Sequence, residues 1–127
     1  MRVAIIGSGA SGIAAAHYLQ QAGFEDFTLF EKGSDLGGTW RDNRYPGVAC
    51  DVPSHLYRFT FAPNPEWTHR CSPGAEIQTY MRDVAGQLGI MDRIAFDNEV
   101  TEARFENDGW DIVTSTGSQG RFDAVIS

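Results

Sequence analysis

The chain has 127 residues, of which 42% are hydrophobic and 21% are charged, so its composition is that of a folded domain and not of a disordered segment. Asp and Glu number 17 against 10 Lys and Arg, and the net charge of −7 argues against a nucleic-acid-binding surface. No apolar run approaches the roughly 18 residues of a membrane span, and the two cysteines form no C-x-x-C pair. We therefore expect a cytoplasmic protein without disulfides that binds neither nucleic acid nor membranes.

The first segments of the chain alternate between strand and helix patterns. Val3–Ile6 is an all-apolar run, as expected for a parallel strand that is buried on both faces. A helix is predicted from about Ser11 to Ala22, with Gly23 ending it. A second strand is predicted over Phe27–Phe30. This order of elements predicts a parallel sheet.

The segment between residues 33 and 74 is rich in glycine, proline and aromatic residues and keeps no regular period. A loop of this length is uncommon in a compact domain and is usually functional. It leads into a predicted helix over Gly74–Leu88, whose apolar residues recur at helical spacing. Ser72 is the expected N-cap of this helix, with Pro73 in its first turn.

The last third of the chain is predicted to form short strands joined by turns. The strands are expected at Ile94–Phe96, Glu99–Phe105, Trp110–Ser115 and Phe122–Ser127, and the turns at Asp108-Gly109 and Thr116–Gly120. The middle two strands form a hairpin. The predicted fold class is therefore α/β, a Rossmann-like domain with a parallel sheet and a β-hairpin or meander as its crossover.

A glycine-rich loop joins the first predicted strand to the first helix. Residues 7–12 are a G-x-G-x-x-G motif, and Glu31 follows Gly12 by 19 residues at the end of the second strand. In such a motif Gly7 permits the tight turn, Gly9 admits a pyrophosphate, and Gly12 lets helix and strand pack closely. Glu31 can accept both ribose hydroxyls and would repel a 2′-phosphate, which favours FAD or NAD over NADP at this loop.

The run from Gly37 to Tyr57 carries a family resemblance. It contains Gly-Gly-Thr-Trp, then Asn-Arg-Tyr-Pro-Gly, then Asp51, then Ser-His-Leu-Tyr, and it resembles the Baeyer–Villiger monooxygenases at this spacing. The resemblance covers all 127 residues and, with the hairpin in place of a crossover helix, favours FAD over NAD. It implies one FAD-binding domain over 1–127, truncated within its C-terminal strand, with the NADPH-binding and substrate regions absent.

The resemblance also implies a set of cofactor-binding residues. They are Gly7, Gly9, Ser11 and Gly12 at the pyrophosphate, Glu31 at the adenosine ribose, Gly38, Thr39 and Trp40 along the pyrophosphate and ribityl chain, Val100 at the adenine, and Tyr57 and Asp51 near the flavin. Val100 fits a plain strand valine equally well. Arg41 and Asp42 stand where close relatives carry an aromatic-rich pair, so the local contacts there are expected to differ.

Asp51 is the one catalytic residue that the resemblance implies. In the family, the matching aspartate lies beside the flavin and pairs with an arginine from a later part of the chain, which serves the oxygen chemistry. A buried carboxylate needs such a partner. The alternative for Asp51 is a turn-forming aspartate before Pro53. The spacing of His, Cys and Asp fits no zinc pattern, so no metal is expected.

The implied function is that of the FAD-binding portion of an NADPH- and O2-dependent monooxygenase. Such an enzyme inserts oxygen next to the carbonyl of a small ketone, or oxidises another organic substrate, and gives an ester or lactone from the ketone. The 127-residue chain alone is expected to lack turnover. Two alternatives remain open: an N- or S-oxidising flavin-containing monooxygenase, and a stand-alone nucleotide-binding module.

Overall fold

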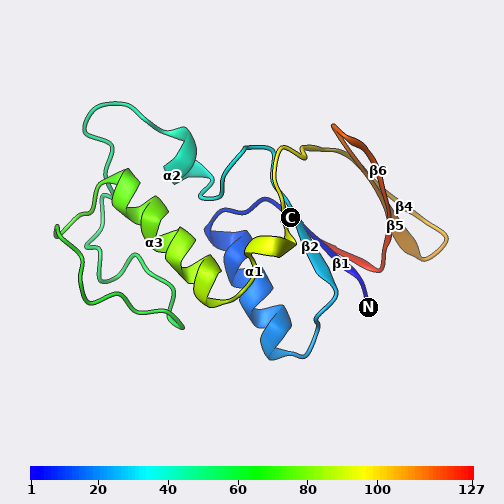
Figure 1. The fold of residues 1–127 in the computed structure, drawn as a ribbon, viewed down its shortest axis with the longest axis horizontal. Helices are drawn as coiled ribbons and strands as arrows, with labels where there is room; N and C mark the ends of the chain where they lie inside the picture. The colour runs from blue at the N-terminus through cyan, green and yellow to red at the C-terminus, as the bar shows by residue number, and fades with distance from the viewer.

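Helices, a parallel sheet and an antiparallel sheet are arranged along the molecule in that order (Figure 1). The computed structural model describes all 127 residues. Its elements are β1 (Val3–Ile6), α1 (Ala10–Gln21), β2 (Phe27–Phe30), α2 (Thr39–Asp42), α3 (Gly74–Gln87), η1 (Met91–Arg93), β3 (Ile94–Ala95), β4 (Val100–Glu106), β5 (Gly109–Thr114), β6 (Gly117–Phe122) and β7 (Ala124–Ile126). The predicted α/β class is confirmed, and no helix is both long and apolar enough to cross a membrane.

The parallel sheet has the strand order β3-β2-β1-β7, and every neighbouring pair is parallel. β1 is central, with Val3 paired to Phe27 of β2 on one side and to Ala124 of β7 on the other. The order therefore reverses at β1. In open parallel sheets ligands bind outside the carboxyl ends of the strands at such a point, and here Gly7 and Glu31 follow directly on β1 and β2.

Both faces of this sheet are covered, which explains the all-apolar first strand. Val3 and Ile5 belong to the main core together with side chains of α1 and α3. Ala4 faces the other way, into a smaller core formed with Phe30, Ile112 and Phe122. The rings of Phe30 and Phe122 meet edge to face at 5.7 Å, which joins the parallel sheet to the antiparallel sheet of β4, β5 and β6.

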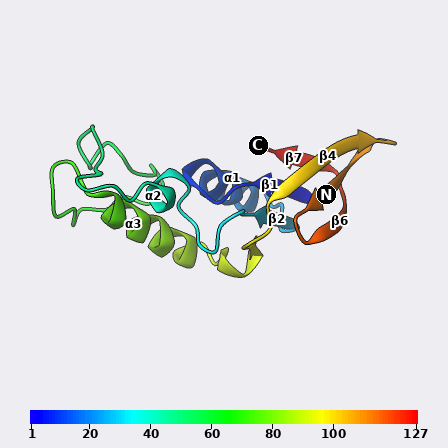
Figure 2. The same cartoon turned by 90° about the horizontal axis from the view of Figure 1, so that it is seen from above.

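The segment from 43 to 73 lies at the end of the molecule opposite the antiparallel sheet (Figure 2). It contains no helix or strand, only an isolated bridge between Ala49 and Pro73. The phenol of Tyr80 on α3 holds it, because the hydroxyl donates to the carbonyl of Ala62 at 2.7 Å and accepts from the N–H of Phe59 at 2.8 Å. The predicted irregular segment is confirmed, except for the single turn of α2.

Two local predictions were wrong at turns and caps. Ser72 does not cap α3: the N-cap is Pro73, while the buried hydroxyl of Ser72 lies 2.8 Å from that of Ser54. The hairpin turn lies at Asn107 and Asp108, both with positive φ, and Gly109 already begins β5. Asn and Asp tolerate the left-handed region better than most residues, so the turn forms one residue earlier than glycine placement predicts.

The segment Thr116–Gly120 is not a turn, because most of it belongs to β6. This strand pairs antiparallel with β5, with Thr114 opposite Gly117 and Trp110 opposite Phe122. Its small and polar residues are those of an exposed edge strand. The last strand is correspondingly shorter than predicted: Phe122 ends β6, and the chain crosses to the parallel sheet at Asp123, whose carboxylate accepts from the N–H of Arg2 at 2.6 Å.

Candidate dinucleotide-binding site

The first wall of the site is the glycine loop between β1 and α1. Gly7 has a φ of +94°, a conformation that L side chains rarely adopt. A Cβ on Gly12 would lie 2.1 Å from the carbonyl oxygen of Gly7 and 3.6 Å from Ile5. The first turn of α1 can therefore pack against the end of β1 only because position 12 has no side chain.

The N-terminus of α1 opens onto this loop. The first i−4 hydrogen bond of the helix runs from the N–H of Ile13 to the carbonyl of Gly9, so the preceding N–H groups of residues 10–12 have no carbonyl to bond within the helix. The first turn carries no acidic side chain. Free N–H groups and the positive end of the helix dipole make this a place where a phosphate can bind.

The second wall is the Gly37-Gly38 turn before α2. The N–H of Gly37 donates to the carbonyl of Ser8 at 3.1 Å. A Cβ on Gly38 would lie 3.3 Å from the Cα of Gly9, so the two glycine segments are in backbone contact. Both Gly37 and Gly38 have positive φ. The turn therefore needs glycine for its conformation as well as for its close approach.

Two adjoining cavities of about 370 and 340 Å³ lie along these walls and together form a groove. They share Ile6, Gly7, Gly9, Gly38 and Thr39. The first extends to Phe30, Glu31, Lys32, Arg41, Asp42, Glu99 and Val100, and the second to Ala10, Ser11, Gly12, Gly37, Trp40, Tyr57 and Met81. Ten of the eleven residues assigned to the cofactor from the sequence thus line one groove, although they come from five separate stretches of chain.

Glu31 is buried at the first end of the groove and accepts four hydrogen bonds. Its Oε2 accepts from the N–H and the hydroxyl of Ser8 at 2.9 and 2.8 Å, and its Oε1 accepts from the N–H of Gly33 at 2.9 Å and from Arg41 at 2.5 Å. Burial alone would raise the pKa of this carboxyl, but the donors outweigh it and lower the pKa. Glu31 is therefore held as a carboxylate at neutral pH.

Arg41 is a groove residue whose contacts the sequence did not predict. Its Nη1 donates to Glu31 and, at 2.6 Å, to the carbonyl of Asp35, while its Nε donates to Asp42 at 2.7 Å. A Cβ on Gly33 would lie 2.4 Å from Nη1, so Gly33 leaves the space that the guanidinium fills. The ion pairs to Asp42 and Glu31 raise the pKa of Arg41. The one feature of the sequence that pointed to Arg41 was that it stands, with Asp42, where close relatives carry an aromatic-rich pair.

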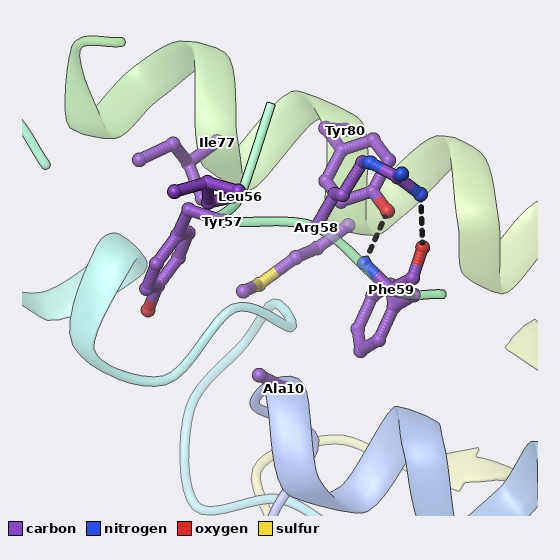
Figure 3. A pocket seen from close by; sticks show the side chains of 8 residues that line it. Ala10, Leu56, Tyr57, Arg58, Phe59, Ile77 and Tyr80 are labelled. Atoms are coloured by element: carbon purple, nitrogen blue, oxygen red, sulfur yellow. Dashed lines mark hydrogen bonds between the residues drawn. The ribbon is translucent and has the colours of Figure 1, made fainter. Parts of the chain in front are cut away.

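Trp40 and Tyr57 connect the far end of the groove to the irregular segment. The indole N–H of Trp40 donates to the hydroxyl of Tyr57 at 2.9 Å, and their rings meet edge to face at 5.5 Å. A third, mostly apolar cavity of about 240 Å³ adjoins the groove here (Figure 3). It shares Ala10, Tyr57 and Met81 with the groove, so an apolar space beside α3 adjoins the end of the groove at Tyr57.

Asp51 is the one proposed site residue outside the groove. It is exposed and forms no ion pair within the chain. Its assignment as a catalytic residue stays a prediction. Cys50 and Cys71 are both free thiols, and no group of three or more His, Cys, Asp and Glu side chains lies together in a way that could hold a metal ion.

Comparison of the sequence with other proteins agrees with this geometry. A Baeyer–Villiger monooxygenase of Streptomyces coelicolor is 47% identical over 129 aligned positions, which cover 100% of this chain and 25% of the relative. A FAD-binding monooxygenase of Aspergillus terreus is 41% identical over 111 positions, covering 85% of this chain and 20% of the relative. The chain spans about a fifth to a quarter of the length of the curated relatives that it matches.

Solved structures give the same result. A steroid monooxygenase bound to NADP superposes with a TM-score of 0.92 at 31% identity, over 99% of this chain and 25% of that one. A cyclohexanone monooxygenase superposes with a TM-score of 0.91 at 33% identity, over 98% of this chain and 25% of that one. An S-allyl-L-cysteine S-oxygenase of Allium sativum superposes with a TM-score of 0.85 at 25% identity, over 98% of this chain and 35% of that one.

The match to a family model covers the part of the chain that builds both walls of the groove. The model of the NAD(P)-binding Rossmann-like domain matches residues 5–72, which is more than half of the chain. The predicted likeness to the N-terminal part of Baeyer–Villiger-type flavin monooxygenases is confirmed over the whole length. The chain therefore belongs to the NAD(P)-binding Rossmann-like domain family, in the form that these flavoprotein monooxygenases share.

Proposed function

We propose that residues 1–127 form a FAD-binding domain and that the groove holds the FAD. The observation that carries the proposal is the groove of two adjoining cavities, one lined by Val100 and the other by Tyr57, which meet at the free N-terminus of α1. Glu31 sets the direction, because a buried carboxylate suits the hydroxyls of an adenosine ribose. The adenine then lies toward Val100, the pyrophosphate at Gly9, and the flavin toward Tyr57.

The residues present fit this cofactor better than NADP. A 2′-phosphate would have to lie against the ionised Glu31, which costs free energy in a buried site. The N-terminus of α1 is free to bind a pyrophosphate, and the two glycine walls can meet beside it because neither Gly9 nor Gly38 carries a side chain. When bound, FAD would supply the electron transfer and oxygen activation of a monooxygenase, while the chain itself supplies binding, orientation and exclusion of water.

For the reaction, we infer oxygen insertion next to the carbonyl of a small ketone, to give an ester or lactone. NADPH would act as reductant, bound mainly outside these residues, and O2 as the oxygen source. This rests on the Baeyer–Villiger monooxygenase relative and on the cyclohexanone monooxygenase structure. We place the protein in the cytoplasm, where NADPH is supplied, and expect no binding to nucleic acid or membranes.

FAD binding is tested by titrating the 127-residue chain with FAD and following the quenching of flavin fluorescence. We expect saturable binding that Glu31→Gln weakens about tenfold or more, because a hydrogen bond to a charged group contributes about 1.5–3 kcal/mol. Glu66→Gln is the matched control, since Glu66 is exposed and lies outside the groove. Absence of FAD binding to a chain that circular dichroism shows to be folded would refute the proposal.

Oxidation of sulfur is a second candidate reaction. It is supported by the S-oxygenase structure, which superposes over nearly the whole chain, although at lower identity than the ketone-oxidising enzyme. Products formed from cyclohexanone and from a thioether, by a protein that carries this domain together with an NADPH-binding region, distinguish the two. A lactone supports the ketone reaction, and a sulfoxide alone supports the second candidate. The 127-residue chain without that region is expected to oxidise no NADPH.

A further inference from the structure

The starting observation is that Glu31 has no free site for a ribose hydroxyl. A carboxylate offers about four lone-pair positions, two on each oxygen. Four donors already fill them: the N–H and hydroxyl of Ser8 on Oε2, and Gly33 and Arg41 on Oε1. A ribose that bonds to Glu31 must therefore displace one of these donors.

Only one of the four donors is free to leave. Two are backbone N–H groups of the glycine loop and of the turn after β2, and both are held by the fold. The hydroxyl of Ser8 belongs to a fully buried residue that a ligand in the groove does not reach. Arg41 differs, because its guanidinium ends a flexible side chain, is 11% exposed and lines the groove.

We propose that Arg41 is an exchangeable cap on Glu31: it leaves Oε1 when an adenosine ribose binds and pairs instead with the pyrophosphate of the same dinucleotide. This inference rests on the proposed FAD site and adds a residue-level account of how that site is filled. Arg41 then has two roles. It stabilises the buried carboxylate while the groove is free, and it binds the phosphates afterwards.

The geometry supports the second half of the exchange. The cavity that Arg41 lines also contains Gly7, Gly9 and Thr39, which surround the proposed pyrophosphate position. Nε and Nη1 of Arg41 are engaged within the chain, whereas Nη2 donates to no group and is not buried. Guanidinium donors match the paired oxygens of a phosphate, and such charge-assisted bonds are about twice as strong as neutral ones.

Two ligands separate this role from a purely structural one. Adenosine carries the ribose but no phosphate, while ADP carries both. We expect Arg41→Gln to weaken ADP binding about tenfold or more and to leave adenosine binding unchanged or tighter, because the ribose no longer has to displace a donor. The measurements are calorimetry for ADP and NMR titration for adenosine. Arg104→Gln, which removes one charge from exposed β4 away from the groove, is the control and should change neither.

Each outcome decides a different point. Equal weakening of ADP and adenosine by Arg41→Gln would show that Arg41 only supports Glu31 and would overturn the exchange, as would no change in either. Arg41→Lys keeps the charge beside Glu31 if the glutamine variant fails to fold, and we expect it to weaken ADP binding while sparing adenosine. If the folded wild-type chain binds neither ligand, the proposed site itself fails; if it binds both and the variants match it, only the exchange fails.

Discussion

A single methyl group at position 12 tests whether the glycine loop is built by close packing. Replacing glycine by alanine inside a helix ordinarily stabilises it by about 1 kcal/mol, because glycine loses more backbone entropy on folding. Gly12 should behave oppositely. Its Cβ would lie 2.1 Å from the carbonyl oxygen of Gly7 and 3.0 Å from the carbonyl carbon, and both are backbone atoms that cannot rotate away.

The magnitude follows from the two opposing terms. Overpacking in a tight core costs about 1–3 kcal/mol, and a contact with backbone lies at the upper end of that range. Set against the helix gain of about 1 kcal/mol, we expect Gly12→Ala to lose about 1–2 kcal/mol of unfolding free energy. FAD binding should weaken as well, because relieving the contact moves the start of α1 away from β1.

Gly86→Ala is the matched comparison in the same assay. Gly86 lies near the end of α3, is exposed, and a Cβ there would meet nothing within 4 Å. We expect it to gain up to about 1 kcal/mol. Urea unfolding followed by circular dichroism measures both variants. A Gly12→Ala chain as stable as wild type, beside a stabilised Gly86→Ala chain, would refute the close-packing argument and with it the reason for a glycine at position 12.

Three further predictions concern the pH dependence, the far end of the groove and the contact between the sheets. The pKa of Glu31 lies below its ordinary 4.5 in the folded chain. The ionised carboxylate therefore stabilises the fold above pH 4.5, and this contribution is lost as the pH falls through the pKa of the folded chain. Glu31→Gln should flatten the acid side of the profile of unfolding free energy against pH, measured by urea unfolding. A double-mutant cycle of Trp40→Phe and Tyr57→Phe should give a coupling of about 0.5–1.5 kcal/mol for their hydrogen bond, and additive effects would contradict it. Phe122→Ala should cost about 3–5 kcal/mol in thermal or urea unfolding, because the ring is fully buried against Phe30, and a loss below about 1 kcal/mol would contradict that packing.

The parts of the fold that the sequence predicted are those determined by neighbours along the chain. β1, β2 and both long helices lie within two residues of their predicted bounds, because apolar runs and helical spacing are local patterns. The glycine motif predicted one wall of the groove for the same reason: the turn, the close approach and the helix start all lie within six residues. Glu31 lies beside the glycine loop because Ile6 of β1 pairs with Phe30 of β2, which places the residues that follow the two strands next to each other.

The errors arose where a residue's partner is distant in sequence. Ser72 has the residue type of an N-cap, but Ser54 lies close enough in space to bind its hydroxyl, and the bridge from Ala49 to Pro73 holds that geometry. The segment 117–122 contains two glycines and a serine, which locally favour a turn. It becomes a strand because β5 offers an unpaired edge, which no local pattern reveals.

The same distinction separates the shape of the site from its selectivity. The shape of the groove depends on the backbone, because Gly9 and Gly38 lie in contact there. That contact requires residues without side chains, so the glycines in the sequence predict it. We expect the selectivity of the groove to depend on which side chains fill the remaining lone pairs of Glu31, and above all on Arg41, which lies ten residues away on another element. Two chains can therefore share the glycine pattern and the fold while differing in how they admit a dinucleotide. Differences between relatives should accordingly be sought at position 41 and its partners before they are sought in the loop.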